Sequence, residues 1–181
     1  SAYTVVQSES KFLIALDRSG PIDYGEMLEA ALPQLDEGGH LRQIVMMGEQ
    51  LQNSISWETM LQQGTQVSDE QLHSRSAQVS VEDRMMLAYT SGTTGHPKGV
   101  IHCHKPVRNT YERAMLLGHN RNDVHLSYLP LFHAYGFSEV AMMVALTGGS
   151  QVLFDVFEPD QVLDAVEEEG GTVLHGFDSH W

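Results

Sequence analysis

A run of hydroxyl and glycine residues followed by a lysine is the stretch of this sequence best suited to chemistry. The run is Thr90, Ser91, Gly92, Thr93, Thr94 and Gly95, with Lys98 three positions later. Glycine allows positive φ and brings backbone N–H groups close to a ligand. The hydroxyls add hydrogen-bond donors, and the lysine adds a positive charge on a flexible stem. These groups predict a site for an oxyanion with several charges, such as the phosphates of a nucleotide.

The spacing separates this loop from a Walker A loop, which has four residues between its glycines and Ser or Thr directly after its Lys. Here two residues separate Gly92 from Gly95, and Gly99 follows Lys98. The order T-S-G-T-T-G-x-P-K-G resembles the phosphate loop of the adenylate-forming superfamily, which includes acyl-CoA synthetases, luciferases and adenylation domains of peptide synthetases. A Gly- and Thr-rich connector without a ligand is the alternative, and the ten-position match favours phosphate binding. The resemblance implies that residues 90–95 hold the β- and γ-phosphates of ATP. It also implies that Lys98 is catalytic and stabilises charge on the departing pyrophosphate.

A second motif covers residues 129–137, Leu-Pro-Leu-Phe-His-Ala-Tyr-Gly-Phe. It resembles the L-P-x-F-H-x-x-G motif of the same superfamily, between a strand end and a helix. By itself, the position of His133 beside Phe132 favours a packed structural histidine, but the motif around it favours a place in the substrate pocket. The resemblance implies that His133 borders the acyl and adenylate pocket and that Gly176 begins a loop that walls the acyl site. Residues 177–181 depart from the commoner G-x-P-x pattern of that loop.

His102 and His104 raise the alternative of a metal site, because residues two apart on a strand share one face. The chain has one cysteine and no second close ligand pair of the kind that structural zinc sites use. We therefore interpret these two histidines as ordinary residues at a strand exit and predict no metal site built by the protein. The acidic run at 167–169 is interpreted as a solvated helix face.

Composition indicates an ordinary globular protein that does not bind nucleic acid. The hydrophobic fraction is 41% and the mean hydropathy is -0.23, and no apolar run approaches the ~20 residues that span a bilayer. The formal net charge is -14, whereas nucleic-acid binding needs an excess of Lys and Arg. Five of the ten cations nevertheless fall within residues 96–121, which predicts a basic patch that attracts a small anion. The single Cys103 fits a reducing compartment, so we expect a cytoplasmic protein.

Alternating apolar strands and helical patterns predict an α/β fold with a mostly parallel, doubly wound sheet and flanking helices. Apolar runs predict strands at 12–16 and 43–47, with a helix between them that ends or kinks near Leu32 because Pro33 follows. One short helix is expected to begin at Ser56 and to end at Gly64, and another is expected to begin at Ser68, which acts as its N-cap. Further strands and helices alternate from residue 85 onward. We expect residues 1–181 to form a single segment, with the first βα units in 1–80 and the phosphate loop and acyl-pocket units in 81–181.

The resemblance covers the whole chain and implies an enzyme that is longer than this sequence. It corresponds to the middle of the large N-terminal domain of an AMP-forming acyl-CoA synthetase. Such an enzyme joins a carboxylic acid to ATP, with Mg²⁺, to give an acyl-adenylate, and then passes the acyl group to CoA. Because the motifs for adenine, ribose and the C-terminal domain are not found, we expect a fragment that is inactive alone and that self-associates through exposed apolar surface. Two alternatives stay open: an adenylation domain that loads a carrier protein, and a non-catalytic phosphate-binding or scaffold module.

Overall fold

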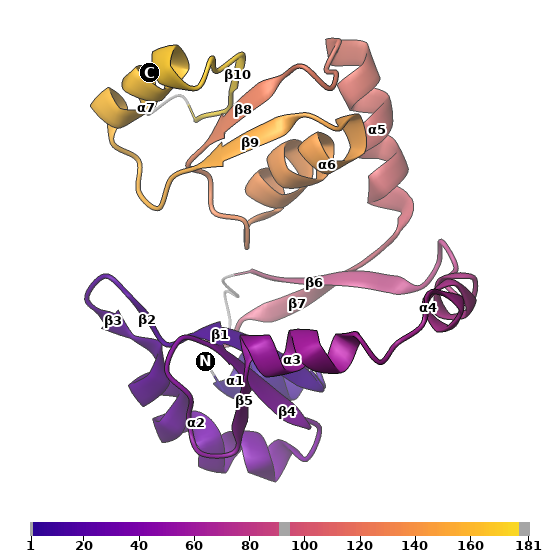
Figure 1. The fold of residues 1–181 in the computed structure, drawn as a ribbon, viewed down its shortest axis with the longest axis vertical. Coiled ribbons are helices and arrows are strands. Elements are labelled where there is room, and N and C mark those ends of the chain that lie inside the picture. Colours follow the sequence, from indigo (N-terminus) through magenta and orange to yellow (C-terminus); the bar gives the residue numbers. More distant parts are fainter. Residues whose placement is uncertain (1, 91–94, 178–181) are drawn as a thin grey trace. The chain divides into compact units, whose positions relative to one another are not determined.

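The computed structural model describes residues 2–90 and 95–177 and divides the chain into two compact units. The first unit takes residues 1–79 and 89–99, and the second takes residues 80–88 and 100–181. Each unit contains its own three-stranded parallel sheet with helices beside it (Figure 1). This arrangement confirms the predicted α/β class with parallel strands and flanking helices.

The first unit is built on a sheet of β1 (Phe12–Leu16), β4 (Gln43–Met47) and β5 (Ser54–Ser56), in the order β1-β4-β5. The two predicted strands are confirmed residue for residue, and they pair in parallel from Phe12↔Gln43 to Leu16↔Met47. The central strand β4 is the most buried, as expected for a strand with neighbours on both sides. The edge strand β5 was not predicted. It is three residues long and is defined by its pairing with β4.

Helix α2 (Tyr24–Gly38) connects β1 to β4 and continues past Pro33. A helix end near Leu32 is therefore wrong. An interior proline removes one backbone hydrogen bond, but Leu35 on the following turn is buried at 2% exposure, and this packing keeps the last turns helical. The helix starts at Asp23, whose side chain accepts a hydrogen bond from the Glu26 N–H, and it ends at Gly39 in the left-handed conformation.

The remaining elements of the first unit are short. Helix α1 (Ala2–Gln7) precedes β1, and β2 (Arg18–Ser19) and β3 (Ile22–Asp23) form an antiparallel hairpin. The two predicted short helices are confirmed as α3 (Trp57–Gly64) and α4 (Asp69–Ser76). Ser56 caps α3, and Ser68 caps α4 in a capping box with Gln71.

Strands β6 (Arg84–Thr90) and β7 (Lys98–Cys103) form a two-stranded sheet that contributes residues to both units. They flank the phosphate loop, as the apolar runs on either side of it predicted. The ends that adjoin the loop, Tyr89–Thr90 and Lys98–Gly99, belong to the first unit.

The second unit is built on β8 (Val124–Ser127), with β9 (Ser150–Leu153) and β10 (Val173–Leu174) parallel to it on either side. Its helices are α5 (Lys105–Leu117), α6 (Met143–Thr147) and α7 (Pro159–Glu168). A π-helix, η1 (Tyr135–Met142), leads directly into α6, where the sequence predicted one regular helix. Leu126 of β8 and Tyr128, which follows the strand, pack in a core with Val162 and Ala165 of α7. Because side chains alternate along a strand, His125 and Ser127 lie on the opposite face.

Among the helices of the described residues, none has the length and apolar character that crossing a bilayer requires.

Candidate functional site

The phosphate loop leaves the end of β6 and returns at the start of β7. Ser91, Gly92, Thr93 and Thr94 lie outside the described residues. Thr90 is the last residue of β6 and Lys98 the first of β7, and the Thr90 hydroxyl donates to the Lys98 carbonyl oxygen at 3.4 Å. Gly95 has φ of +94°, and no atom of the described residues lies within 4 Å of the position of a Cβ. Glycine is therefore required at 95 by backbone conformation and not by lack of space.

Lys98 is exposed, and within residues 2–90 and 95–177 its ammonium group forms no ion pair. A lysine whose charge is not neutralised by a neighbouring acid can attract an incoming anion. The structure thus places Thr90, Gly95 and Lys98 together at one end of the β6–β7 sheet, all in the first unit.

Helix α1 contacts the flanks of this loop, a role that the sequence did not reveal. The Tyr89 hydroxyl donates to the Thr4 carbonyl oxygen at 3.0 Å and also to the Gln7 side chain. On the other flank, the rings of Tyr3 and His96 stack with centroids 5.0 Å apart. These contacts fix both approaches to the loop against one helix, which reduces the conformational freedom of the loop ends before any ligand arrives.

His133 is held by the backbone of its own motif. Its N–H donates to the Pro130 carbonyl oxygen at 3.0 Å, and its Nδ1 accepts from the Tyr135 N–H at 3.2 Å. An Nδ1 that accepts a hydrogen bond carries no proton, so the neutral ring has its proton on Nε2. The side chain is exposed, which leaves Nε2–H able to donate to a ligand. The structural role and a pocket role are therefore compatible in one residue.

The backbone that surrounds Gly136 leaves no room for a side chain, which explains the glycine in this motif. A Cβ at this position would lie 2.4 Å from the Pro130 carbonyl oxygen and 2.9 Å from the Leu129 carbonyl oxygen. Both are backbone atoms that have little room to move, so only glycine allows η1 to start so close to the end of β8. The position of His133 depends on that approach, because Pro130 also accepts its N–H.

Tyr135 joins the two residues that were predicted to border the acyl group. Its N–H donates to His133, and its ring meets the rings of His175 and Phe177 edge-on at centroid distances of 6.0 and 5.3 Å. His175 and Phe177 are the neighbours of Gly176 in sequence. The second unit therefore brings His133 and the Gly176 segment together through a tyrosine to which the sequence analysis assigned no role.

The predicted basic patch at 96–121 is largely neutralised by acids, which corrects that expectation. Lys105 pairs with Glu82 at 2.9 Å, and this contact raises the pKa of the lysine. The other two ion pairs join Arg108 to Glu112 and Arg113 to Glu139.

The metal alternative at His102 and His104 gains no support from the structure, because these two histidines do not belong to any group of three metal-ligating side chains in the described part of the chain.

Comparison with known proteins gives one consistent result. The chain is 28% identical over 183 residues to an acyl-CoA ligase, sidI, of Aspergillus fumigatus, and the match covers 96% of this chain and 30% of that protein. A solved putative long-chain-fatty-acid CoA ligase from Rhodopseudomonas palustris has a TM-score of 0.76 at 19% identity, covering 99% of this chain and 41% of the other. The anthranilate CoA ligase AuaEII in complex with anthranoyl-AMP has a TM-score of 0.74 at 22% identity, covering 97% and 32%.

These relatives are two to three times longer than the 181 residues, so the chain spans about a third of the ligases it matches. The family model for the AMP-binding enzyme matches residues 1–181, the full length of the chain. The chain belongs to the AMP-binding enzyme family.

Proposed function

We propose that this chain is part of the large N-terminal domain of an AMP-forming acyl-CoA ligase. The reaction has two steps. A carboxylate attacks the α-phosphate of ATP to give an acyl-adenylate and pyrophosphate, and the CoA thiol then takes the acyl group and releases AMP. Membership of the AMP-binding family and the acyl-CoA ligases among its relatives support this proposal. The observation that carries it is the exposed Lys98 beside Thr90 at the end of the β6–β7 sheet.

In this proposal, residues 90–95 hold the β- and γ-phosphates through N–H and hydroxyl groups. Lys98 places its charge where negative charge grows on the departing pyrophosphate, so it stabilises the transition state more than the ground state. The described loop residues Thr90 and Gly95 offer hydroxyl and backbone groups and no carboxylate. This donor set fits a magnesium ion that arrives with the ATP phosphates, since Mg²⁺ commonly retains waters and phosphate oxygens as ligands. Bound there, the ion would neutralise phosphate charge.

The acyl group is assigned to the second unit. His133 presents Nε2–H, which suits a carboxylate or an adenylate oxygen, and Gly176 has no side chain to fill the space beside it. Tyr135 holds both segments in place through its N–H and its ring. A substitution at His133 should therefore act mainly on the KM for the acid.

Lys98→Ala in the full-length enzyme tests the proposal, with Lys105→Ala as the matched control because Lys105 is also an exposed lysine and pairs with Glu82. Loss of one contact to a charged group costs about 1.5–3 kcal/mol, which corresponds to a fall in kcat/KM of roughly 10- to 150-fold. We expect that fall in ATP–pyrophosphate exchange for Lys98→Ala and little change for Lys105→Ala. Unchanged exchange in Lys98→Ala would refute the assignment. Thioester formed on a carrier protein but not on CoA would identify the enzyme as a carrier-loading adenylation domain.

For the isolated 181-residue chain we propose no turnover and some self-association in a reducing compartment such as the cytoplasm. The outer face of β1 supports the association, because Phe12, Ile14 and Leu16 are 64, 51 and 42% exposed. Measured ATP turnover by this chain alone would exclude the hypothesis that the isolated chain is inactive, and it would also exclude the scaffold alternative.

A further inference from the structure

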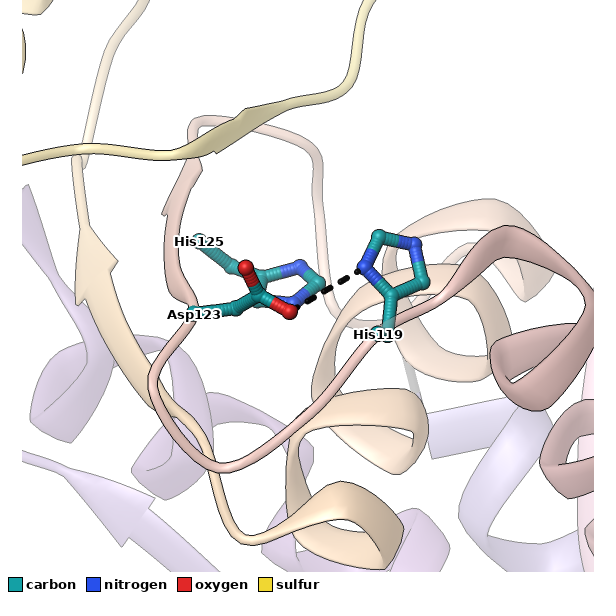
Figure 2. Close-up of side chains that lie close together, drawn as sticks. All are labelled: His119, Asp123 and His125. Atoms are coloured by element: carbon teal, nitrogen blue, oxygen red, sulfur yellow. Dashed lines mark ion pairs between the residues drawn. The ribbon is translucent and has the colours of Figure 1, made fainter.

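Three side chains of the second unit converge at the start of β8 (Figure 2). His119 follows Gly118 at the end of α5, Asp123 lies in the turn after it, and His125 is the second residue of β8. One ligand atom from each of the three lies within 4.8 Å of the others. The His119 Nδ1 is 3.6 Å from the Asp123 Oδ2. Ligand atoms about 2.0–2.1 Å from a tetrahedral ion lie about 3.3–3.4 Å apart, so this pair needs little movement to share one ion.

His125 gives an independent reason to expect a ligand. It is 0% exposed, and within the described residues neither of its ring nitrogens has a hydrogen-bond partner. Buried side-chain nitrogens are normally paired, because an unpaired one retains the full desolvation penalty. The rings of His119 and His175 lie 5.0 and 5.8 Å from the His125 ring, and the His175 Nε2 is also buried with no hydrogen-bond partner among the described residues. The buried nitrogens of His125 therefore have lone pairs available for a bound ion.

Imidazole nitrogens and carboxylate oxygens bind divalent ions, and the cluster contains both kinds of side chain.

Hydrogen bonds to both oxygens of Asp123 hold its carboxylate in place, as neighbouring groups do for known metal ligands. Its Oδ2 accepts from the Asn120 N–H at 2.8 Å, and its Oδ1 accepts from the Thr172 hydroxyl at 2.9 Å. The Thr172 hydroxyl oxygen in turn accepts from the Val124 N–H at 3.0 Å. The Asn120 Nδ2 also donates to Oδ2, at the longer distance of 3.4 Å. A bound ion would therefore use the second lone pair of Oδ1 or replace this long contact on Oδ2.

We propose that His119, Asp123 and His125 bind one divalent transition-metal ion of the zinc class. Two imidazole nitrogens and one carboxylate oxygen match the ligand preference of Zn²⁺ and Co²⁺, whereas Mg²⁺ and Ca²⁺ prefer oxygen ligands alone. The side chains of His119 and Asp123 are 10 and 17% exposed, so a water molecule can supply the fourth ligand from that side. The ion joins the end of α5 to the first residues of β8. This site does not depend on the proposed ligase activity.

The test is calorimetric titration of the full 181-residue chain with Zn²⁺ after removal of metal by a chelator, with Co²⁺ absorption as a second probe. We expect one ion per chain and a visible Co²⁺ band. His119→Ala and Asp123→Asn should each weaken binding at least 10-fold, and Thr172→Val about 10-fold through the loss of its contact to Asp123. The matched control is the double variant His102→Ala/His104→Ala, which removes two histidines of the same unit and should leave binding unchanged. Circular dichroism verifies that each variant is folded.

If a variant of one of the proposed metal ligands fails to fold, NMR of the unmodified chain tests whether these residues bind the ion. The ring nitrogens of His119 and His125 should shift on addition of Zn²⁺, and those of His102 and His104 should not. Absence of Zn²⁺ binding by the parent chain would overturn the proposal. So would binding that is unchanged in both ligand variants, or binding that is lost in the double control.

Discussion

The substitution Gly136→Ala is the most direct test of how the histidine motif is built. Its Cβ would lie 2.4 Å from the Pro130 carbonyl oxygen, far inside the contact distance. Overpacking of this kind typically costs about 1–3 kcal/mol, and the upper end applies because the obstructing atoms belong to the backbone. Alanine regains up to about 1 kcal/mol over glycine in a helix. We therefore expect a net loss of about 2 kcal/mol in the free energy of unfolding.

Urea unfolding measures this loss, and a midpoint about 1 M lower is expected for an m-value near 2 kcal/mol/M. Hydrogen exchange at the Phe137 amide, which donates to the His133 carbonyl oxygen, reports on η1 locally. Gly64→Ala is the matched control, because it makes the same change at the end of α3 with nothing within 4 Å of the new Cβ. That variant should be neutral or up to about 1 kcal/mol more stable. Equal midpoints for Gly136→Ala and the parent would refute the close-approach argument.

Three further predictions concern the first unit. Gly48→Ala should destabilise by about 2–3 kcal/mol in urea unfolding, since Gly48 has φ of +115° and its Cβ would lie 2.3 Å from the Asp17 carboxyl. Hydrogen bonding from the Glu49 N–H, first among its causes, lowers the pKa of Asp17 below its ordinary 3.8, so the unfolded chain takes up the proton first as pH falls. The stability that Asp17 contributes is thus complete above about pH 4 and is lost as pH falls through its lower folded-state pKa. Thermal unfolding across pH 2–6 measures this effect, and Asp17→Asn should lose less stability on acidification than the unmodified chain. Tyr89→Phe removes the hydrogen bond to Thr4 and should lower stability by about 1 kcal/mol, measured by urea unfolding.

Each of these has a control or a contradicting outcome. Gly20→Ala has φ of +53° but nothing within 4 Å of its Cβ, so it should cost less than Gly48→Ala; equal losses would show that strain and not the Asp17 contact dominates. An acid unfolding curve identical in Asp17→Asn would contradict the pKa argument. Tyr24→Phe is the control for Tyr89→Phe, because the Tyr24 hydroxyl makes no hydrogen bond within the described part of the chain. Equal losses in both variants would contradict the role of the Tyr89 hydrogen bond.

Sequence patterns predicted those parts of the fold that local chemistry determines. The strands at 12–16 and 43–47 are short apolar runs, and the cap at Ser68 is a local signal, so all three were found. Ser56 was placed inside the expected helix, whereas it caps α3. The strand β5 is a Ser-Ile-Ser tripeptide that exists because β4 offers it a partner, and no local pattern indicates that pairing. The passage of α2 through Pro33 likewise depends on the burial of Leu35 by tertiary packing.

The same distinction holds for the sites. The phosphate loop and the histidine motif are contiguous in sequence, so both could be located before the structure, although their roles stay predictions. Tyr135 was underestimated because its importance comes from His175 and Phe177, which lie forty or more residues away. The cluster of His119, Asp123 and His125 has spacings of four and two residues across a helix end, a turn and a strand. No single helical or strand period brings these residues to one face, so the sequence analysis did not single them out; the only histidine pair that it considered, His102 and His104, it interpreted as ordinary strand-exit residues.

The division of β6 and β7 between the two units has a consequence for how the chain folds during synthesis. The first unit needs residues 89–99, but residues 80–88 of the second unit leave the ribosome before them. The first unit therefore cannot complete its contacts until residue 99 has emerged, and a chain that ends at residue 79 would lack part of it. Contacts between segments so distant in sequence slow folding and leave intermediates exposed. An expression boundary placed after Val79 would separate residues that belong to one unit, so a useful shortened chain must keep both strands intact.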